Sequence, residues 1–305
     1  MSLTPSQQYH TTAMAPAEFR SVSEASPSRH RKTKGNLSFF VKDMFTIRQM
    51  MLFGALAQLA SSAILPSRYA QCLTLSMLSW TVIYTVWQSK SERNDFNADV
   101  ILGKTSSQIP ASAYNSATGP SLYGNKPGQN SVVVVHLGVR FNHALGPLAS
   151  GGQDIGDLND EMMKELEDCA EELGFLGVTA WRGNEGPSQN TLMTVFYFRT
   201  MEGLHTFAHS KAHRKGWDWY NKYVKAGNTS IGVFHEVFYS TPGSFETVYL
   251  NMPPVLLGAT SIPTTDEATG KRMFVRPLVD ASGPALKTGL LRMGRSATQD
   301  EKNAV

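Results

Sequence analysis

Three histidines recur at four-residue spacing in a segment whose apolar pattern predicts a helix: His205, His209 and His213. Residues four apart lie on neighbouring helical turns, where imidazoles can share a metal ion or face one cavity. Each successive histidine of the three is rotated by about 40° around the helix axis, so we do not expect all three rings to bind one ion. The alternative is that the histidines form a polar helix face that is exposed to solvent and binds nothing. We single out His213 because Trp217 follows one turn later and adds an aromatic wall to the same side.

A fourth histidine, His235, precedes Glu236 in a predicted strand. Strand alternation puts their side chains on opposite faces, and His235 then shares its face with Val233 and Val237. We therefore predict that His235 points toward an apolar interior. It is either a core histidine held by one hydrogen bond or a neutral imidazole that transfers a proton at a pocket wall near pH 7.

Polar residues also end the first predicted strand, where Arg140 and Asn142 share a face with His136. A charged side chain at such a position needs a partner or a pocket, and both interpretations stay open. The sequence lacks a Gly-x-Gly-x-x-Gly turn, a phosphate-binding loop and a Gly-x-Ser-x-Gly elbow, so a Rossmann-type cofactor site is not indicated.

The elements that must position these residues follow the order strand, helix, strand, strand, helix, strand. Strands are predicted at 131–142, 178–182, 191–199 and 231–240, and helices at 157–173 and 201–224, with a loop at 151–156. This order is the α+β, ferredoxin-like arrangement, whose sheet carries helices on one face only. The open face needs cover, so we expect a dimeric α+β barrel and a homodimer.

An apolar run at 51–87 is the strongest compositional feature, and Pro66-Ser67-Arg68 interrupts it. With basic residues at both ends, it predicts a membrane hairpin at 44–88 whose ends face the cytosol, in a membrane of the endoplasmic-reticulum type. A single span, a re-entrant segment and a buried soluble hairpin remain the alternatives.

The other segments are predicted to be less ordered. We expect a disordered basic tail at 1–38, a linker or arm at 94–130, one domain at 131–258 and a loose polar tail at 259–305. The net charge of +3 lies largely in a basic cluster at 29–34, which we interpret as a topology signal rather than a nucleic-acid site. Two cysteines allow no disulfide framework or zinc motif, which favours a cytosolic main domain.

Several segments together resemble a known family. They read Val139-Arg-Phe-Asn142, Ala212-His-Arg-Lys-Gly-Trp-Asp-Trp-Tyr-Asn221, Gly232-Val-Phe-His-Glu236 and Phe245-Glu-Thr-Val-Tyr-Leu-Asn-Met-Pro253. They are similar to the fungal fumagillin-pathway monooxygenase-like family, which is related to the antibiotic-biosynthesis monooxygenases with a dimeric α+β barrel. The resemblance covers about 131–254. It implies a monooxygenase of fungal secondary metabolism that oxidises an apolar terpenoid or polyketide. Together with the hairpin predicted from the apolar run, this gives a membrane-anchored monooxygenase.

The resemblance points to the positions of the site, and our hypothesis gives catalytic roles to His213, His235 and Asn142. The same hypothesis gives substrate contacts to Arg140, Trp217, Glu236, Tyr249 and Asn251. Molecular oxygen would be the co-substrate, and no cofactor is expected. The helix around His213 also resembles the haem-ligating helix of barrel-type haem-degrading enzymes, which would make His213 a haem ligand. The alternatives are therefore a haem-dependent dehydratase or oxygenase, and a non-catalytic or cyclase-like barrel that binds a lipophilic intermediate.

Overall fold

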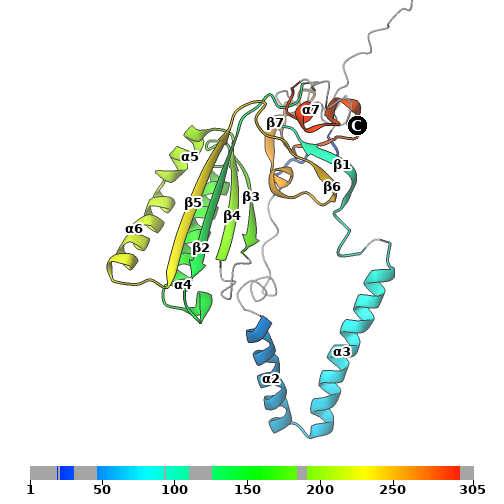
Figure 1. Cartoon of the computed structure of the whole chain (residues 1–305), viewed down its shortest axis with the longest axis vertical. Coiled ribbons are helices and arrows are strands. Elements are labelled where there is room, and N and C mark those ends of the chain that lie inside the picture. The colour runs from blue at the N-terminus through cyan, green and yellow to red at the C-terminus, as the bar shows by residue number, and fades with distance from the viewer. Residues whose placement is uncertain are drawn as a thin grey trace, which may run out of the picture.

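The computed structural model of the chain describes residues 19, 21–30, 47–92, 94–109, 126–183 and 191–295. Its main sheet contains four strands in the order β3-β4-β2-β5, all antiparallel (Figure 1). These strands are β2 (Val132–Phe141), β3 (Phe175–Arg182), β4 (Thr191–Phe198) and β5 (Ile231–Ser240). The predicted α+β class and the ferredoxin-like element order are confirmed.

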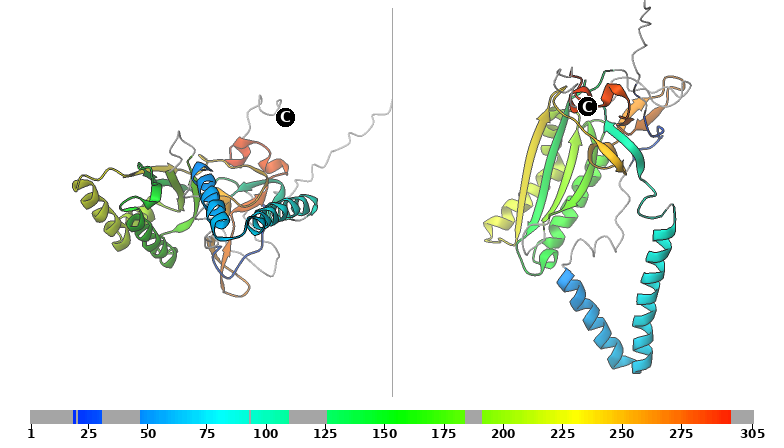
Figure 2. Two further views of the ribbon diagram at one scale, coloured as in Figure 1. Left: turned by 90° about the horizontal axis from the view of Figure 1, so that it is seen from below. Right: turned by 45° about the vertical axis from the view of Figure 1, so that its right-hand side comes forward.

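Three helices cover one face of this sheet: α4 (Gly152–Asp168), α5 (Met201–Ala208) and α6 (Lys211–Lys225) (Figures 1 and 2). Val133 and Val135 of β2 belong to the core under α4 and α5, and Phe141 belongs to a second cluster with Tyr223 of α6. Helix α4 begins five residues earlier than predicted, after Gly151 with its φ of 83°. The segment 151–156, predicted as a loop, is therefore mostly helical.

The helix predicted at 201–224 is divided in two. Helix α5 ends at Ala208, and Ser210 begins α6 by accepting a hydrogen bond from the His213 backbone N–H. A serine side chain in this position satisfies a free N–H of the first turn and so favours a new helix start. His205 and His209 are consequently separated from His213 by a break, so the rotation expected for one continuous helix does not apply.

The opposite face of the sheet is partly covered by two small sheets. One has the order β6-β1-β9 and the other pairs β7 with β8. These strands are β1 (Ile101–Ser107), β6 (Tyr249–Met252), β7 (Ile262–Thr265), β8 (Arg272–Val275) and β9 (Leu278–Asp280). The short helices of the chain are η1 (Gly146–Leu148), η2 (Leu256–Ala259), η3 (Pro284–Leu286) and α7 (Gly289–Arg292). Their core packs against Val132, Val195 and Tyr197 of the main sheet.

This packing corrects the predicted segments on either side of the domain. The linker at 94–130 contains β1, whose Ser106 is fully buried, and the tail at 259–305 contributes Val279 and Ala281 to the core. Phe19 is also buried, and Ser21 forms a bridge with Val279, so part of the predicted disordered tail at 1–38 is ordered. The rest of that tail lies outside the described residues, and the domain boundaries 131–258 are too narrow.

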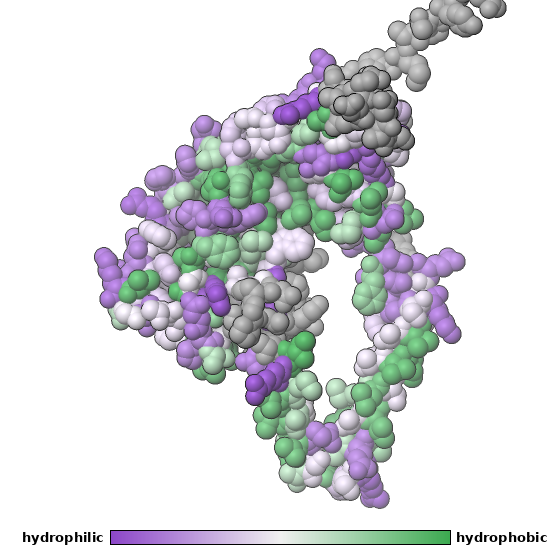
Figure 3. Space-filling model, viewed as in Figure 1, coloured by the Kyte–Doolittle hydropathy of each residue, from purple (hydrophilic) through white to green (hydrophobic). Residues whose placement is uncertain are grey.

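The N-terminal helices α2 (Ile47–Ile64) and α3 (Ser67–Lys90) form a V that extends away from the sheets (Figure 1). A helix pair was predicted at 44–88, and residues 44–46 lie outside the described residues. Most of its large apolar side chains are exposed, as the green surface of Figure 3 shows. Nevertheless, none of the helices in the described part of the chain has both the length and the apolar character needed to cross a bilayer. The helix pair is found, but the predicted transmembrane spans are not.

Candidate functional site

His213 is positioned in the first turn of α6 by the Ser210 cap. Its ring is half-buried and meets the Phe207 ring edge-on, with 5.4 Å between the centroids. Burial, which disfavours the charged imidazolium, lowers the pKa of His213, and the nearby His235 and His209 lower it further. The Ala208 carbonyl and Glu165 act in the opposite direction. The Nδ1 atom is buried and has no hydrogen-bond partner of normal geometry. His213 therefore favours its neutral form.

His235 lies on β5 opposite Leu137 of β2 and is exposed. The prediction that it points toward an apolar interior is wrong: its neighbour Val237 is also 40% exposed. The reason is that β5 is an edge strand, so neighbouring side chains surround it on one side only. His235 lowers the pKa of His213, and through its register with Leu137 it lies on the helix-covered side of the sheet.

Trp217 follows His213 on the next turn of α6, as the sequence predicted. It is 53% exposed, and its ring packs against Tyr220 with 6.1 Å between the centroids. The structure thus brings two of the predicted catalytic residues and one predicted substrate contact into the same region of the helix-covered face. These are His213, His235 and Trp217.

Three other predicted residues lie on the opposite face of the sheet. Glu236 approaches His136 with 3.7 Å between Oε2 and Nδ1, and Arg140 is exposed farther along β2. Asn142 packs over Gly232, and its Nδ2 atom donates to the Thr229 carbonyl oxygen at 3.3 Å. Because successive strand residues alternate, the sheet separates Asn142 from His213 and His235.

The last two predicted residues belong to β6 in the smaller sheet. The Tyr249 hydroxyl accepts a hydrogen bond from the Gly258 N–H and lies 3.2 Å from the Ser107 hydroxyl. Burial raises the pKa of Tyr249. Asn251, in the left-handed region with φ 50°, accepts a hydrogen bond from the Gly103 N–H. Both side chains make contacts that hold β1 and β6 together, and the structure does not bring them to the histidines.

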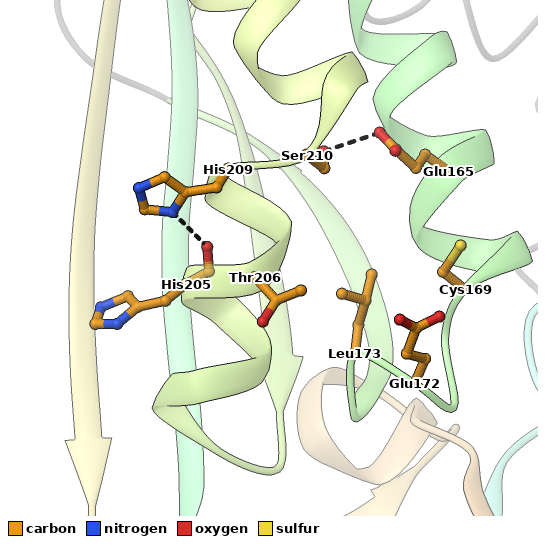
Figure 4. Close-up of a pocket in the computed structure, with 8 residues that line it drawn as sticks. All are labelled: Glu165, Cys169, Glu172, Leu173, His205, Thr206, His209 and Ser210. Carbon is orange, nitrogen blue, oxygen red and sulfur yellow. Dashed lines mark hydrogen bonds between the residues drawn. The ribbon is translucent and has the colours of Figure 1, made fainter.

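A cavity of about 570 Å³ opens between α4 and α5. Its lining residues are Glu165, Cys169, Glu172, Leu173, His205, Thr206, His209 and Ser210 (Figure 4). The rings of His205 and His209 point away from Cys169 and Glu172, so these groups do not converge (Figure 4). Within the described residues, no group of three or more His, Cys, Asp or Glu side chains could hold a metal ion. His213 does not line this cavity, which therefore gives no support to haem ligation by His213.

Glu165 is the residue that sequence reasoning missed. Its carboxylate accepts hydrogen bonds from the Ser210 hydroxyl and the Ala212 N–H, both at 2.9 Å, and so fixes the start of α6 from α4 (Figure 4). No local pattern connects residues 45 positions apart. The serine itself was a usable signal, because Ser favours the residue before a helix.

Comparison with known proteins decides the family. The family model described as Monooxygenase af470-like matches residues 132–257. Monooxygenase af470 of Aspergillus fumigatus is 35% identical over 270 residues, which is 88% of this chain and 94% of that protein. The chain belongs to the af470-like monooxygenase family. As a member of this monooxygenase family it is an oxidoreductase, and the resemblance found in the sequence is confirmed.

Solved structures show a weaker likeness. Aldoxime dehydratase OxdRE, in complex with butyraldoxime, is 17% identical and aligns over 49% of this chain and 42% of its own with a TM-score of 0.37. SnoaB, a cofactor-independent oxygenase from Streptomyces nogalater, is 11% identical over 36% of this chain and 91% of its own, with a TM-score of 0.24. At this level of similarity, neither structure bears on the chemistry of this member of the af470-like family.

Proposed function

We propose that this af470-like family member is a monooxygenase of fungal secondary metabolism that oxidises an apolar, ionisable terpenoid or polyketide with molecular oxygen and no bound cofactor. The observation that carries the proposal is the state of His213. It is half-buried in the first turn of α6, burial lowers its pKa, and the exposed His235 lowers that pKa further. A neutral imidazole in this setting can accept a proton near pH 7.

Without a cofactor, the substrate itself must supply the electrons that reduce oxygen. His213 removes a proton from an activated C–H or O–H group, and the resulting carbanion or phenolate reacts with O₂. For an activated methylene, two C–H bonds break and one C=O bond forms. One oxygen atom enters the product, and the other leaves as water with both hydrogens. His235, being exposed, can exchange the first proton with solvent, which returns a proton for the water that is formed.

The proposal leaves a reduced role for several predicted site residues. Trp217 is the proposed wall against which an apolar substrate packs, since its indole is largely exposed beside His213. Arg140, Asn142 and Glu236 lie on the other face of the sheet, so we assign them to a subunit interface rather than to the reacting atoms. Tyr249 and Asn251 stabilise the smaller sheet through the contacts described above.

The partner for that other face is proposed to be a second copy of the chain. Trp181, Phe234 and Phe238 share this face by strand alternation and register, and they are 44%, 38% and 50% exposed. Aromatic side chains are the type that subunit interfaces favour. A homodimer through this face would cover them together with the His136–Glu236 pair.

We also propose that the protein acts at the cytosolic face of a membrane of the endoplasmic-reticulum type. The exposed apolar side chains of α2 and α3 support this location, as do the basic residues near the ends of the helix pair. An apolar substrate concentrates in such a membrane.

The test measures oxygen uptake by the full-length protein with anthrone, an activated methylene compound, and with a panel of terpenoids. Replacement of His213 by Ala or Gln should lower kcat by about 10²–10⁴-fold, the usual effect of losing a general base. His205→Ala is the matched control, because His205 lies across the helix break. Unchanged turnover in folded His213 variants would remove His213 from the mechanism. Wild-type protein that consumes no oxygen with any compound would favour a binding barrel without catalysis.

A further inference from the structure

Several hydroxyl side chains of α2 and α3 are hydrogen-bonded within the helix pair itself. Hydroxyl groups donate to carbonyl oxygens about one turn earlier at Ser61, Thr74, Ser76, Thr81, Thr85 and Ser89. The Thr74 hydroxyl also lies 2.5 Å from the Gln58 Oε1 atom, which joins the two helices. Hydrocarbon offers no hydrogen-bond partners, so polar groups that enter it must be satisfied internally. The arrangement suits helices whose surroundings are lipid.

The charges of the helix pair have one sign. Residues 47–91 contain no Asp or Glu, whereas Arg48, Arg68 and Lys90 lie near the ends of the helices. Basic residues beside apolar helices are attracted to the anionic headgroups of a membrane surface. The charge therefore complements an anionic bilayer better than it complements an apolar protein groove.

A second apolar feature lies beside the start of α2. The Gln49 side chain of α2 donates to the Ala144 carbonyl oxygen at 3.5 Å, and Figures 1 and 2 show α2 beginning near this end of the sheet. The turn that follows Ala144 exposes Leu145 and Leu148, which are 56% and 63% accessible. No acidic residue occurs from 140 to 153. The turn therefore lies next to α2 and, like the helix pair, exposes apolar side chains and contains no acidic residue.

The backbone of this turn is also satisfied internally. The N–H groups of Gly146, Leu148 and Ala149 donate to carbonyl oxygens three residues earlier, at 2.9, 3.1 and 3.0 Å. Pro147 has no N–H to satisfy. A turn with two exposed leucines and paired backbone donors can enter the apolar part of a membrane surface at little cost in lost hydrogen bonds.

We infer that Leu145 and Leu148 insert into the same anionic lipid surface as α2 and α3, so that this end of the four-stranded sheet faces the bilayer. The inference rests on the proposed membrane location and adds the orientation of the domain. An apolar substrate leaving the bilayer then meets the end of the sheet at which β2 finishes.

An environment-sensitive label at position 148 tests this orientation. The full-length chain carries Leu148→Cys with Cys72→Ser and Cys169→Ser, is labelled with NBD-maleimide, and is mixed with vesicles of phosphatidylcholine and phosphatidylserine. The NBD emission should shift to the blue and be quenched by doxyl-labelled lipid. The matched control carries Leu250→Cys on β6, which is 61% exposed in the smaller sheet, and its emission should not change.

The native Cys72, free and exposed on α3, reports on the helix pair in the Cys169→Ser protein. A response at Cys72 without one at 148 would overturn the contact of the turn. No change in NBD emission at either position would overturn lipid contact altogether. An emission shift that depends on protein concentration without vesicles would point to self-association instead.

Replacing both Leu145 and Leu148 by Asp should weaken vesicle binding by at least about tenfold. Oxygen uptake with anthrone, measured without vesicles, separates these outcomes from failure of the proposed activity.

Discussion

The protonation of His213 is the residue-scale property on which the proposed chemistry depends. Its imidazole has lost part of its water, which disfavours the charged form, and the imidazoles of His235 and His209 disfavour that form further. A base with a lowered pKa stays unprotonated at a lower pH than a free histidine does. The same group in water would be partly protonated near its ordinary pKa of 6.5.

We therefore expect the acid limb of kcat/KM to lie below pH 6.5, where His213 becomes protonated. The same pKa should appear when the ring Cε1–H of His213 is titrated by NMR without substrate. His235→Gln removes an imidazole that lowers the pKa of His213, so it should raise the pKa of His213 and move both curves to higher pH. A His213 titration at or above the ordinary value in the wild-type protein would contradict this view of the site.

The start of α6 is the feature that matters at the scale of elements. Ser210 accepts a hydrogen bond from the His213 N–H, and its hydroxyl donates to Glu165 of α4. The cap thus sets the position of His213 and joins two of the helices that cover the sheet. A helix that ran unbroken through Ser210 would place the ring elsewhere.

Replacing Ser210 by Ala should lower the free energy of unfolding by about 1 kcal/mol, the usual effect of losing an N-terminal cap. Urea denaturation followed by circular dichroism measures this change. Thr206→Ala is the control, since its hydroxyl donates to the Glu202 carbonyl oxygen of its own helix. Equal stability of the two variants would show that the cap does not hold α6 in place.

At the scale of the whole molecule, the two faces of the sheet are covered differently. Helices α4, α5 and α6 cover one face, and segments from both ends of the chain cover part of the other (Figure 2). The remaining part exposes the aromatic residues assigned to the dimer. One part of this face is therefore covered by the chain's own terminal segments, and we assign the other part to contact with a second copy of the chain.

Val279→Ala tests the contribution of the C-terminal segment. This side chain is fully buried, so its loss should lower the free energy of unfolding by about 2 kcal/mol through lost burial and a residual cavity. Urea denaturation measures it, with Leu250→Ala as an exposed control expected to change stability by less than about 0.5 kcal/mol. Equal effects would restore the view of 259–305 as a loose tail.

Phe238→Asp tests the proposed dimer. The ring lies 5.3 Å from that of His136 on the open part of the sheet, and an Asp there would place a negative charge in the interface beside Glu236. Light scattering after size exclusion should give a dimer for the wild-type protein and a monomer for the variant. Tyr239→Asp is the matched control on the opposite side of β5. A monomeric wild-type protein would contradict the proposal.

The sequence by itself determined the βαββαβ order, the helix pair and the family resemblance, because hydrophobic periodicity and motif spacing are local properties of the chain. Only the tertiary structure decided that β1 is a strand, since it pairs with β6 and β9, which lie far away in the sequence. It also placed Asn142 on the other side of the sheet from His213 and left His235 exposed. Local spacing gives the face of a strand, whereas its exposure depends on which elements pack against it and whether it lies at the edge of the sheet.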